Sequence, residues 1–243
     1  TATPAAAAAG LRRLPADGAM PPPPADFVGT GSGDGEAEAP TGAGAAPQAY
    51  RRGDTTARHT GTLIHRMLRI IARQGPAYWA GKVAQRRDRF AEELAALGVA
   101  EAEREAASER VAAVLENALA DVTGRWLLDP GHSEARCEYP VSGLVGGRLV
   151  DGIIDRTFID AEGVRWIVDY KAAVPGEAED TEAFLDRQQA LHRDQLARYA
   201  ELTAAMEERP VRVGLYFPGW AGWRWWEAPD SLSPSRGEGQ GEG

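Results

Sequence analysis

Two acidic side chains and one lysine lie close together in the segment 151–172, which reads DGIIDRTFIDAEGVRWIVDYKA. Asp155 interrupts an otherwise apolar strand-like run, and Asp169 directly follows the apolar residues 166–168. Side chains alternate between the two faces of a strand, so Asp169 and Lys171 point the same way, about 7 Å apart. The pattern predicts carboxylates and an ammonium group on neighbouring strands.

The residues between the two acids predict how these strands pair. A three-residue loop that ends at Gly163, with this glycine in the left-handed conformation, closes a tight hairpin. Such a loop pairs Asp160 with Val164 and therefore places Asp155 directly across from Asp169. A loop longer by one residue would shift the pairing and separate the two acids.

Two close carboxylates repel each other and are costly to desolvate unless a cation lies between them. Oxygen ligands at this spacing suit Mg²⁺, and Mn²⁺ can substitute. Lys171 beside them could hold a water or neutralise charge on a phosphate. The alternative is a structural hairpin in which Asp155 and Asp169 pair with arginines. Of 27 basic residues only Lys82 and Lys171 are lysine. An ordinary ion pair in this chain would be expected to use arginine, so Lys171 favours the chemical interpretation.

The surrounding periodicity predicts the elements that position these groups. Helices are expected over 60–74, 77–97, 102–122 and 181–206, and strands over 136–141, 148–159, 164–172, 211–217 and 222–226. Helices followed by three strands, a helix and one or two strands make a mixed α/β domain.

Composition limits the class of protein. The net charge is −9, which argues against a nonspecific basic coat for nucleic acid but allows a local cationic groove. The single cysteine, Cys137, excludes an internal disulfide framework and a four-cysteine zinc or iron–sulfur site, and fits a reducing compartment. No run of 18 apolar residues occurs, so no membrane-spanning segment is expected.

The ends of the chain differ from its centre. Residues 1–50 consist largely of alanine, glycine and proline, which predicts a disordered linker, and residues 229–243 predict a disordered tail. The folded domain is then expected over residues 51–228. The first residue is threonine and not methionine, so we expect a piece of a longer product.

Four motifs resemble the PD-(D/E)XK nuclease superfamily, in the RecB-like branch found at the C-terminus of bacterial helicase–nucleases such as RecB, AddA and UvrD-like proteins. They occur in the family's order over about residues 58–217, as Gly61-Thr-Leu-Ile-His65, Gly152-Ile-Ile-Asp155, Asp169-Tyr170-Lys171 and Gln195-Leu-Ala-Arg-Tyr199. The resemblance implies a restriction-endonuclease-like αβββαβ core with a mixed central sheet and extra N-terminal helices.

The resemblance also implies roles. Asp155 and Asp169 would be catalytic, metal-binding carboxylates, and Lys171 the catalytic lysine. His65 would be a further metal ligand, and the backbone carbonyl of Tyr170 would complete the protein ligands. The activity implied is Mg²⁺-dependent hydrolysis of DNA, by exonuclease or endonuclease action.

The last motif, Gln195 and Tyr199, would support the site and contact DNA. The residues alone leave alternatives open. Tyr199 fits a core position on its helix equally well, and His65 fits the border between core and surface. A glutamine in the middle of an apolar stripe is harder to explain, because a buried amide needs partners.

The resemblance further implies a role in DNA repair and recombination in the bacterial cytoplasm. The expected partners are single-stranded DNA, an upstream helicase region of the same polypeptide and a partner subunit. Residues 1–50 would tether the nuclease and raise its effective concentration at the DNA. The sequence contains no G-x-x-x-x-G-K-[S/T], so no nucleotide-driven motor of its own is expected.

Three alternatives remain beside this prediction. One is a non-cleaving DNA-binding or structural module of a helicase that keeps the nuclease fold. Another is a free-standing nuclease of the single-strand-processing kind, whose iron–sulfur cluster a lone cysteine cannot hold. A helical interaction protein would leave the pair Asp155 and Asp169 unexplained.

Overall fold

The computed structural model describes residues 47–228. The helices are α1 (Pro47–Gln74), α2 (Pro76–Trp79), the 3₁₀ helix η1 (Ala84–Arg86), α3 (Arg87–Ala96), α4 (Glu101–Ala120), α5 (Val122–Leu127) and α6 (Thr181–Ala204). The strands are β1 (Ser133–Val145), β2 (Arg148–Ile159), β3 (Arg165–Tyr170), β4 (Val211–Phe217) and β5 (Gly222–Glu227).

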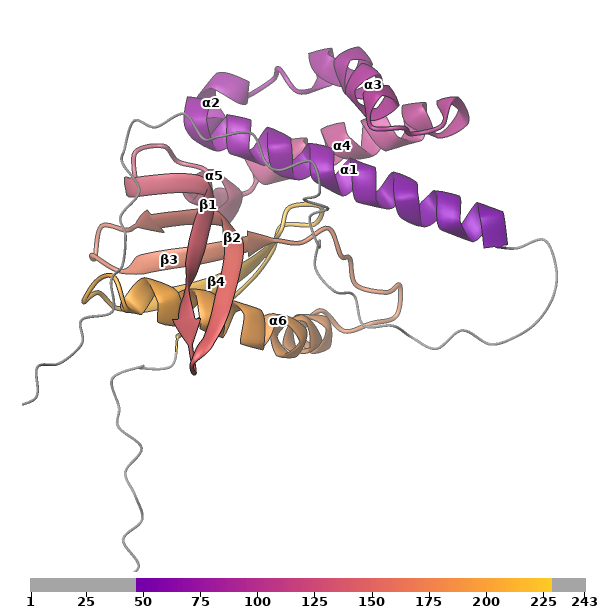
Figure 1. Cartoon of the computed structure of the whole chain (residues 1–243). Coiled ribbons are helices and arrows are strands. Elements are labelled where there is room, and N and C mark those ends of the chain that lie inside the picture. The colour runs from indigo at the N-terminus through magenta and orange to yellow at the C-terminus, as the bar shows by residue number, and fades with distance from the viewer. Residues whose placement is uncertain (1–46, 229–243) are drawn as a thin grey trace, which may run out of the picture. The chain divides into compact units, whose positions relative to one another are not determined.

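Within this part of the chain the strands form one mixed sheet in the order β1-β2-β3-β4-β5. Neighbouring strands are antiparallel except for β3 and β4, which are parallel. A parallel pair needs a crossover, and α6 provides it. The helices that precede the sheet cover one face and α6 covers the other (Figure 1). The predicted α/β class and restriction-endonuclease-like element order are confirmed.

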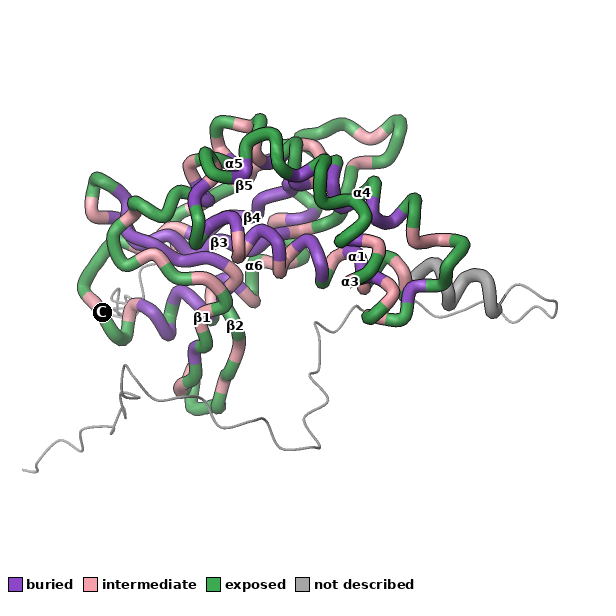
Figure 2. Tube along the Cα trace, turned by 90° about the horizontal axis from the view of Figure 1, so that it is seen from above, coloured by how far each residue is buried: buried purple, intermediate pink, exposed green. Residues whose placement is uncertain are grey.

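Strand β3 lies between two hydrophobic cores. Trp166, Val168 and Tyr170 belong to the core under the N-terminal helices, whereas Ile167 belongs to the core under α6. All six residues of β3 are buried, and Figure 2 shows the buried trace running through β3 and β4. Burial on both faces is typical of a central strand covered by helices on each side.

The β1–β2 hairpin changes faces halfway along its length. Cys137 packs toward the core under the N-terminal helices, whereas Tyr139, two residues later, packs toward the core under α6. Simple alternation would place both on one face. Glu138 between them has a left-handed backbone, with φ at 49°. The flanking register places it opposite Asp155, so the ribbon crosses over at Asp155. The outer end of the hairpin projects from the sheet (Figures 1 and 2).

The β2–β3 loop has the predicted three-residue form. Asp160 N donates to Val164 O over 3.0 Å, and Gly163 has φ at 82°. The Asp160 side chain closes the loop, because it accepts hydrogen bonds from Val164 N over 2.8 Å and from Trp166 Nε1 over 2.7 Å. The strands then pair in register from Ile159↔Arg165 to Arg156↔Val168.

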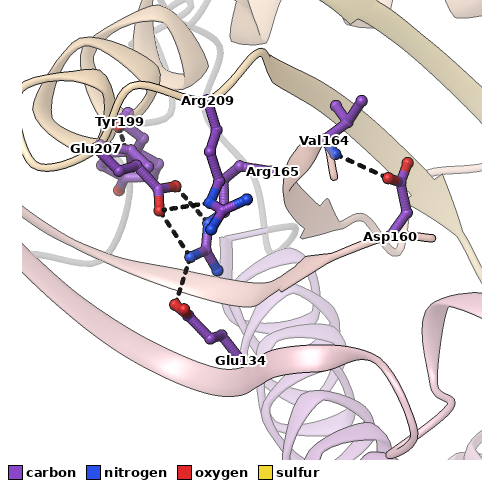
Figure 3. A network of polar contacts seen from close by, with 8 residues as sticks. Glu134, Asp160, Val164, Arg165, Tyr199, Glu207 and Arg209 are labelled. Carbon is purple, nitrogen blue, oxygen red and sulfur yellow. Dashed lines mark hydrogen bonds and ion pairs between the residues drawn. The ribbon is translucent and has the colours of Figure 1, made fainter. Parts of the chain in front are cut away.

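An ion-pair network fixes the start of β3 (Figure 3). Arg165 Nε donates to Glu207 Oε1 over 2.6 Å, and Nη2 donates to Glu134 Oε2 over 2.7 Å. Arg209 Nε lies 3.7 Å from Glu207 Oε2. The Arg165 side chain is only 8% exposed, so the carboxylates compensate a nearly buried charge and join β3 to β1 and to the chain after α6.

Some predicted boundaries differ. The helix expected over 77–97 is divided into α2, η1 and α3, because Gly81 adopts a left-handed φ of 72°. Helix α1 begins at Pro47 and not at residue 60, so residues 47–50, which we expected in the linker, are helical. The rest of the predicted linker and the tail 229–243 lie outside the described residues. Among the helices of residues 47–228, none is long and apolar enough to cross a membrane.

Candidate active site

Asp155 lies where the β2–β3 ladder ends. The last paired residues are Arg156 and Val168, and a continued antiparallel ladder would next use the Tyr170 amide for a bond to the β2 backbone. Instead, Tyr170 N donates to Asp155 Oδ2 over 2.8 Å. The other oxygen, Oδ1, lies 3.3 Å from His65 Nδ1. One carboxylate therefore connects β2 with β3 and α1.

His65 reaches the site from α1, beside the buried residues Leu63 and Ile64. Its side chain is 35% exposed, and its ring meets the Tyr170 ring edge-on at a centroid distance of 5.9 Å. Burial of the imidazole opposes its protonation, but the hydrogen bond and the charge of Asp155 outweigh this effect. The pKa of His65 is therefore raised, with a smaller contribution from Asp169. His65, which we expected at the border between core and surface, thus faces the Asp155 carboxylate.

Asp169 and Lys171 form the second half of the site. Asp169 is buried, and its Oδ2 lies 2.8 Å from Lys171 Nζ. Lys171 N donates to Tyr216 O, which fixes the lysine backbone against β4. Burial raises the pKa of Asp169 to about 6, and the negative charge of Asp155 adds to this shift, while Lys171 partly opposes it. The structure thus brings both acids and the lysine into one electrostatic group.

The donor types match a hard divalent cation, and the charges of Asp155 and Asp169 both act on His65. Among residues 47–228, however, no three His, Cys, Asp or Glu side chains converge closely enough to enclose an ion as they stand. The contacts His65–Asp155 and Lys171–Asp169 are direct. The expected ligand set is therefore not preformed.

Two observations still fit a cation at this point. Asp169 Oδ2 is buried, and apart from its ion pair with Lys171 it has no hydrogen-bond partner among residues 47–228. The charge of Asp155 also disfavours ionisation of Asp169, and a bound cation would remove this penalty. The chemistry of the donors fits the ion, although the side chains would have to exchange their present contacts for it.

Gln195 and Tyr199 lie on α6. Gln195 Nε2 donates to Tyr199 Oη over 3.2 Å, and Tyr199 is buried in the core under α6. The tyrosine ring lies against Gly152, where an added Cβ would come within 2.5 Å of Tyr199 Oη. Tyr199 is therefore a core residue that supplies the partner of the glutamine amide. Tyr199 therefore supports β2 three positions before Asp155.

Two residues that sequence reasoning did not consider, Arg156 and Arg69, also border the site. Arg156 is 2% exposed, and its guanidinium donates to Leu127 O over 2.9 Å and to Asp129 O over 2.6 Å. Arg69, one turn after His65, forms an ion pair with Glu138. The sequence could have indicated Arg156, because an arginine directly follows Asp155 in an apolar strand. It could not have indicated the Arg69–Glu138 pair, which depends on the packing of α1.

A mixed sheet between helices, with two acids and a lysine where a β-hairpin opens, is the arrangement of a restriction-endonuclease-like nuclease domain. The family model of the PD-(D/E)XK nuclease superfamily matches residues 42–224, about three quarters of the chain. The chain belongs to this superfamily. No curated protein matches it.

Proposed function

We propose that this chain is a Mg²⁺-dependent deoxyribonuclease. The observation that carries the proposal is the electrostatic group formed by Asp155, Asp169 and Lys171, in which burial and the Asp155 charge raise the pKa of Asp169 to about 6. Strongly perturbed carboxylates with a specific charge partner are typical of functional sites. Superfamily membership supports nuclease chemistry for this group.

The residues have distinct proposed roles. Asp155 and Asp169 would hold the cation, with His65 and the backbone carbonyl of Tyr170 as further ligands. A bound Mg²⁺ would supply Lewis-acid chemistry, stabilising charge on the phosphodiester and lowering the pKa of a water. The contact of Asp155 with Tyr170 N would keep its carboxylate oriented toward the opening between the strands.

Lys171 would act on the reacting atoms. Its side chain is 17% exposed, and its Nζ lies 2.8 Å from Asp169 Oδ2. We propose that it positions the water that attacks phosphorus in line with the leaving 3′-oxygen, and that it stabilises the negative charge that develops on the phosphate. A compact ammonium suits this role better than a planar guanidinium, which agrees with the use of lysine here.

The test is cleavage of labelled single- and double-stranded DNA with Mg²⁺ or with EDTA. Lys171→Ala is compared with Lys82→Ala, since Lys82 packs over the Tyr78 ring and lies outside the site. We expect cleavage only with Mg²⁺, a loss of at least about 100-fold in Lys171→Ala, and no change in Lys82→Ala. Thermal unfolding checks that both variants are folded.

Degradation in EDTA, or undiminished cleavage by Lys171→Ala, would contradict the proposed chemistry. A wild-type protein that binds DNA but cuts it under no condition would instead favour the non-cleaving module. These outcomes separate an error about the active residues from an error about the activity itself.

We further propose that the domain works as the nuclease part of a RecB/AddA-like helicase–nuclease in bacterial DNA repair and recombination. The support is the order of the four motifs, including Gln195 and Tyr199, and the absence of a nucleotide-binding loop in this sequence. The motor would then be supplied by a helicase region or partner. Duplex degradation by the native, full-length product should depend on ATP, and ATP-independent degradation would contradict this context.

A further inference from the structure

A cavity of about 460 Å³ lies beside the candidate active site, between the end of α1 and the inner part of β1. Arg73, Arg136 and Arg156 line it together with Glu138. Tyr139, whose ring packs toward the core under α6, and Pro140 also line it. The volume falls within the range of small-molecule sites, about 300–1,000 Å³.

The cavity is cationic although the whole chain carries a net charge of −9. Its one carboxylate, Glu138, is already paired with Arg69. Within residues 47–228, neither Arg73 nor Arg136 has a carboxylate within ion-pair distance. Two guanidinium groups at the cavity are therefore available to an external anion.

Arg156 gives the cavity a fixed charge. It is 2% exposed, and two of its nitrogens are held by backbone carbonyls. The third, Nη1, contacts only the Cys137 sulfur, at 3.4 Å, and sulfur is a weak acceptor. A nearly buried guanidinium with a weakly used N–H group faces a space large enough for a ligand.

The cavity and the candidate active site adjoin the same crossing of the β1–β2 ribbon. Glu138, in the cavity wall, lies opposite Asp155 at the crossing of the β1–β2 ribbon. On α1, His65, Arg69 and Arg73 follow one another at intervals of four residues, so they share one helix face at steps of about 6 Å. A row of basic side chains therefore leads from the proposed metal site to the cavity.

We propose that this cavity binds the phosphate of a nucleotide next to the one that is cleaved. Arg73 and Arg136 contact the phosphate, and Arg156 contributes a fixed positive charge. Guanidinium groups match phosphate geometry through paired hydrogen bonds. This inference rests on the proposed nuclease function and identifies where its strand would be held.

The test compares the double variant Arg73→Ala/Arg136→Ala with a double control, Arg87→Ala/Arg110→Ala. The control removes two exposed arginines of α3 and α4 that do not line the cavity. Binding of a labelled single-stranded oligonucleotide is measured in EDTA at several salt concentrations. We expect affinity to fall about 10- to 100-fold and the salt slope to decrease by about 0.7, because one phosphate contact is lost. The control should change neither quantity.

A second arm distinguishes a strand from a free nucleotide. Inorganic phosphate and a deoxynucleoside monophosphate compete with the oligonucleotide for the wild-type protein. We expect competition only at concentrations far above that of the strand. A free mononucleotide that binds more tightly than the strand would overturn the assignment to a strand.

Failure of this inference differs from failure of the proposed function. Undiminished strand affinity in the double variant, or an equal loss in the control, overturns the cavity assignment even if Mg²⁺-dependent cleavage is normal. Loss of affinity confined to the double variant, in a protein that does not cleave, supports the cavity and refutes the nuclease. In an active enzyme, the double variant should raise KM more than it lowers kcat.

Discussion

Replacement of Asp169 by asparagine should change how the stability of the protein depends on pH. In the folded state, burial and then the charge of Asp155 raise the pKa of Asp169 from 3.8 to about 6. A raised carboxyl pKa favours the protonated, folded form, so its stabilising effect is complete below pH 3.8. This effect is lost as the pH rises to about 6. Asparagine has nearly the same shape and does not titrate.

The size of the change in unfolding free energy follows from the shift in the pKa of Asp169. A difference of about two pH units corresponds to about 3 kcal/mol, at about 1.4 kcal/mol per unit. Asp169 is 8% exposed, so solvent screening reduces this value little. Between pH 4 and pH 7, the unfolding free energy of Asp169→Asn should therefore rise by about 3 kcal/mol relative to that of the wild type.

The assay is urea unfolding in metal-free buffer at intervals between pH 4 and pH 7.5, where a two-state transition gives the free energy directly. Asp151→Asn serves as a matched control, because Asp151 lies on the same strand as Asp155 but is exposed. The control should follow the wild type. Addition of Mg²⁺ at pH 7.5 should stabilise the wild type, through binding to the folded state, more than Asp169→Asn.

Parallel pH profiles for the wild type and Asp169→Asn would refute the reasoning. Such a result would mean that Asp169 titrates normally and that Asp155 does not reach it electrostatically. A cation shared by the two acids would then lose its main support, whatever the result of the cleavage assays.

Two further substitutions test the framework of the site. Arg165→Ala should lower the free energy of unfolding in urea by about 3 kcal/mol, because it removes the nearly buried cation between two carboxylates. The control Arg209→Ala, at the exposed edge of the network, should lower it by less than about 1 kcal/mol. Equal losses would show that burial of Arg165 has no energetic consequence. Gly152→Ala should destabilise the fold by about 1–3 kcal/mol, since its Cβ would come within 2.5 Å of the Tyr199 ring. The control Gly61→Ala, which has open space around it on α1, should be neutral or stabilising. A neutral Gly152→Ala would refute the close packing of Tyr199 on β2.

Local signals predicted the hairpin that carries the acids. Gly163 supplies the left-handed turn residue, and the apolar run 166–168 identifies a buried strand, so the pairing of Asp160 with Val164 follows from neighbouring residues alone. The interruption of the helix at Gly81 was harder to predict from the sequence, because a single glycine within a helical pattern is often tolerated.

The remaining features depend on distant contacts. The left-handed backbone at Glu138 has no local signature, because glutamate rarely adopts it and packing on both sides of the ribbon imposes it. The contact of His65 with Asp155 joins residues 90 positions apart and requires α1 to lie over the sheet. Motif order indicated that these groups belong together, but it could not show that they meet in direct ion pairs.

The placement of β3 between two apolar layers fixes the register of this strand, and with it the direction in which Asp169 points. Sliding this strand by one position would turn Trp166, Val168 and Tyr170 toward α6 and push Asp169 under the N-terminal helices. Such a shift would remove these apolar side chains from their core and place a carboxylate there, and the loss of hydrophobic burial excludes it. The alignment of Asp169 and Lys171 is thus fixed by the apolar side chains of both cores.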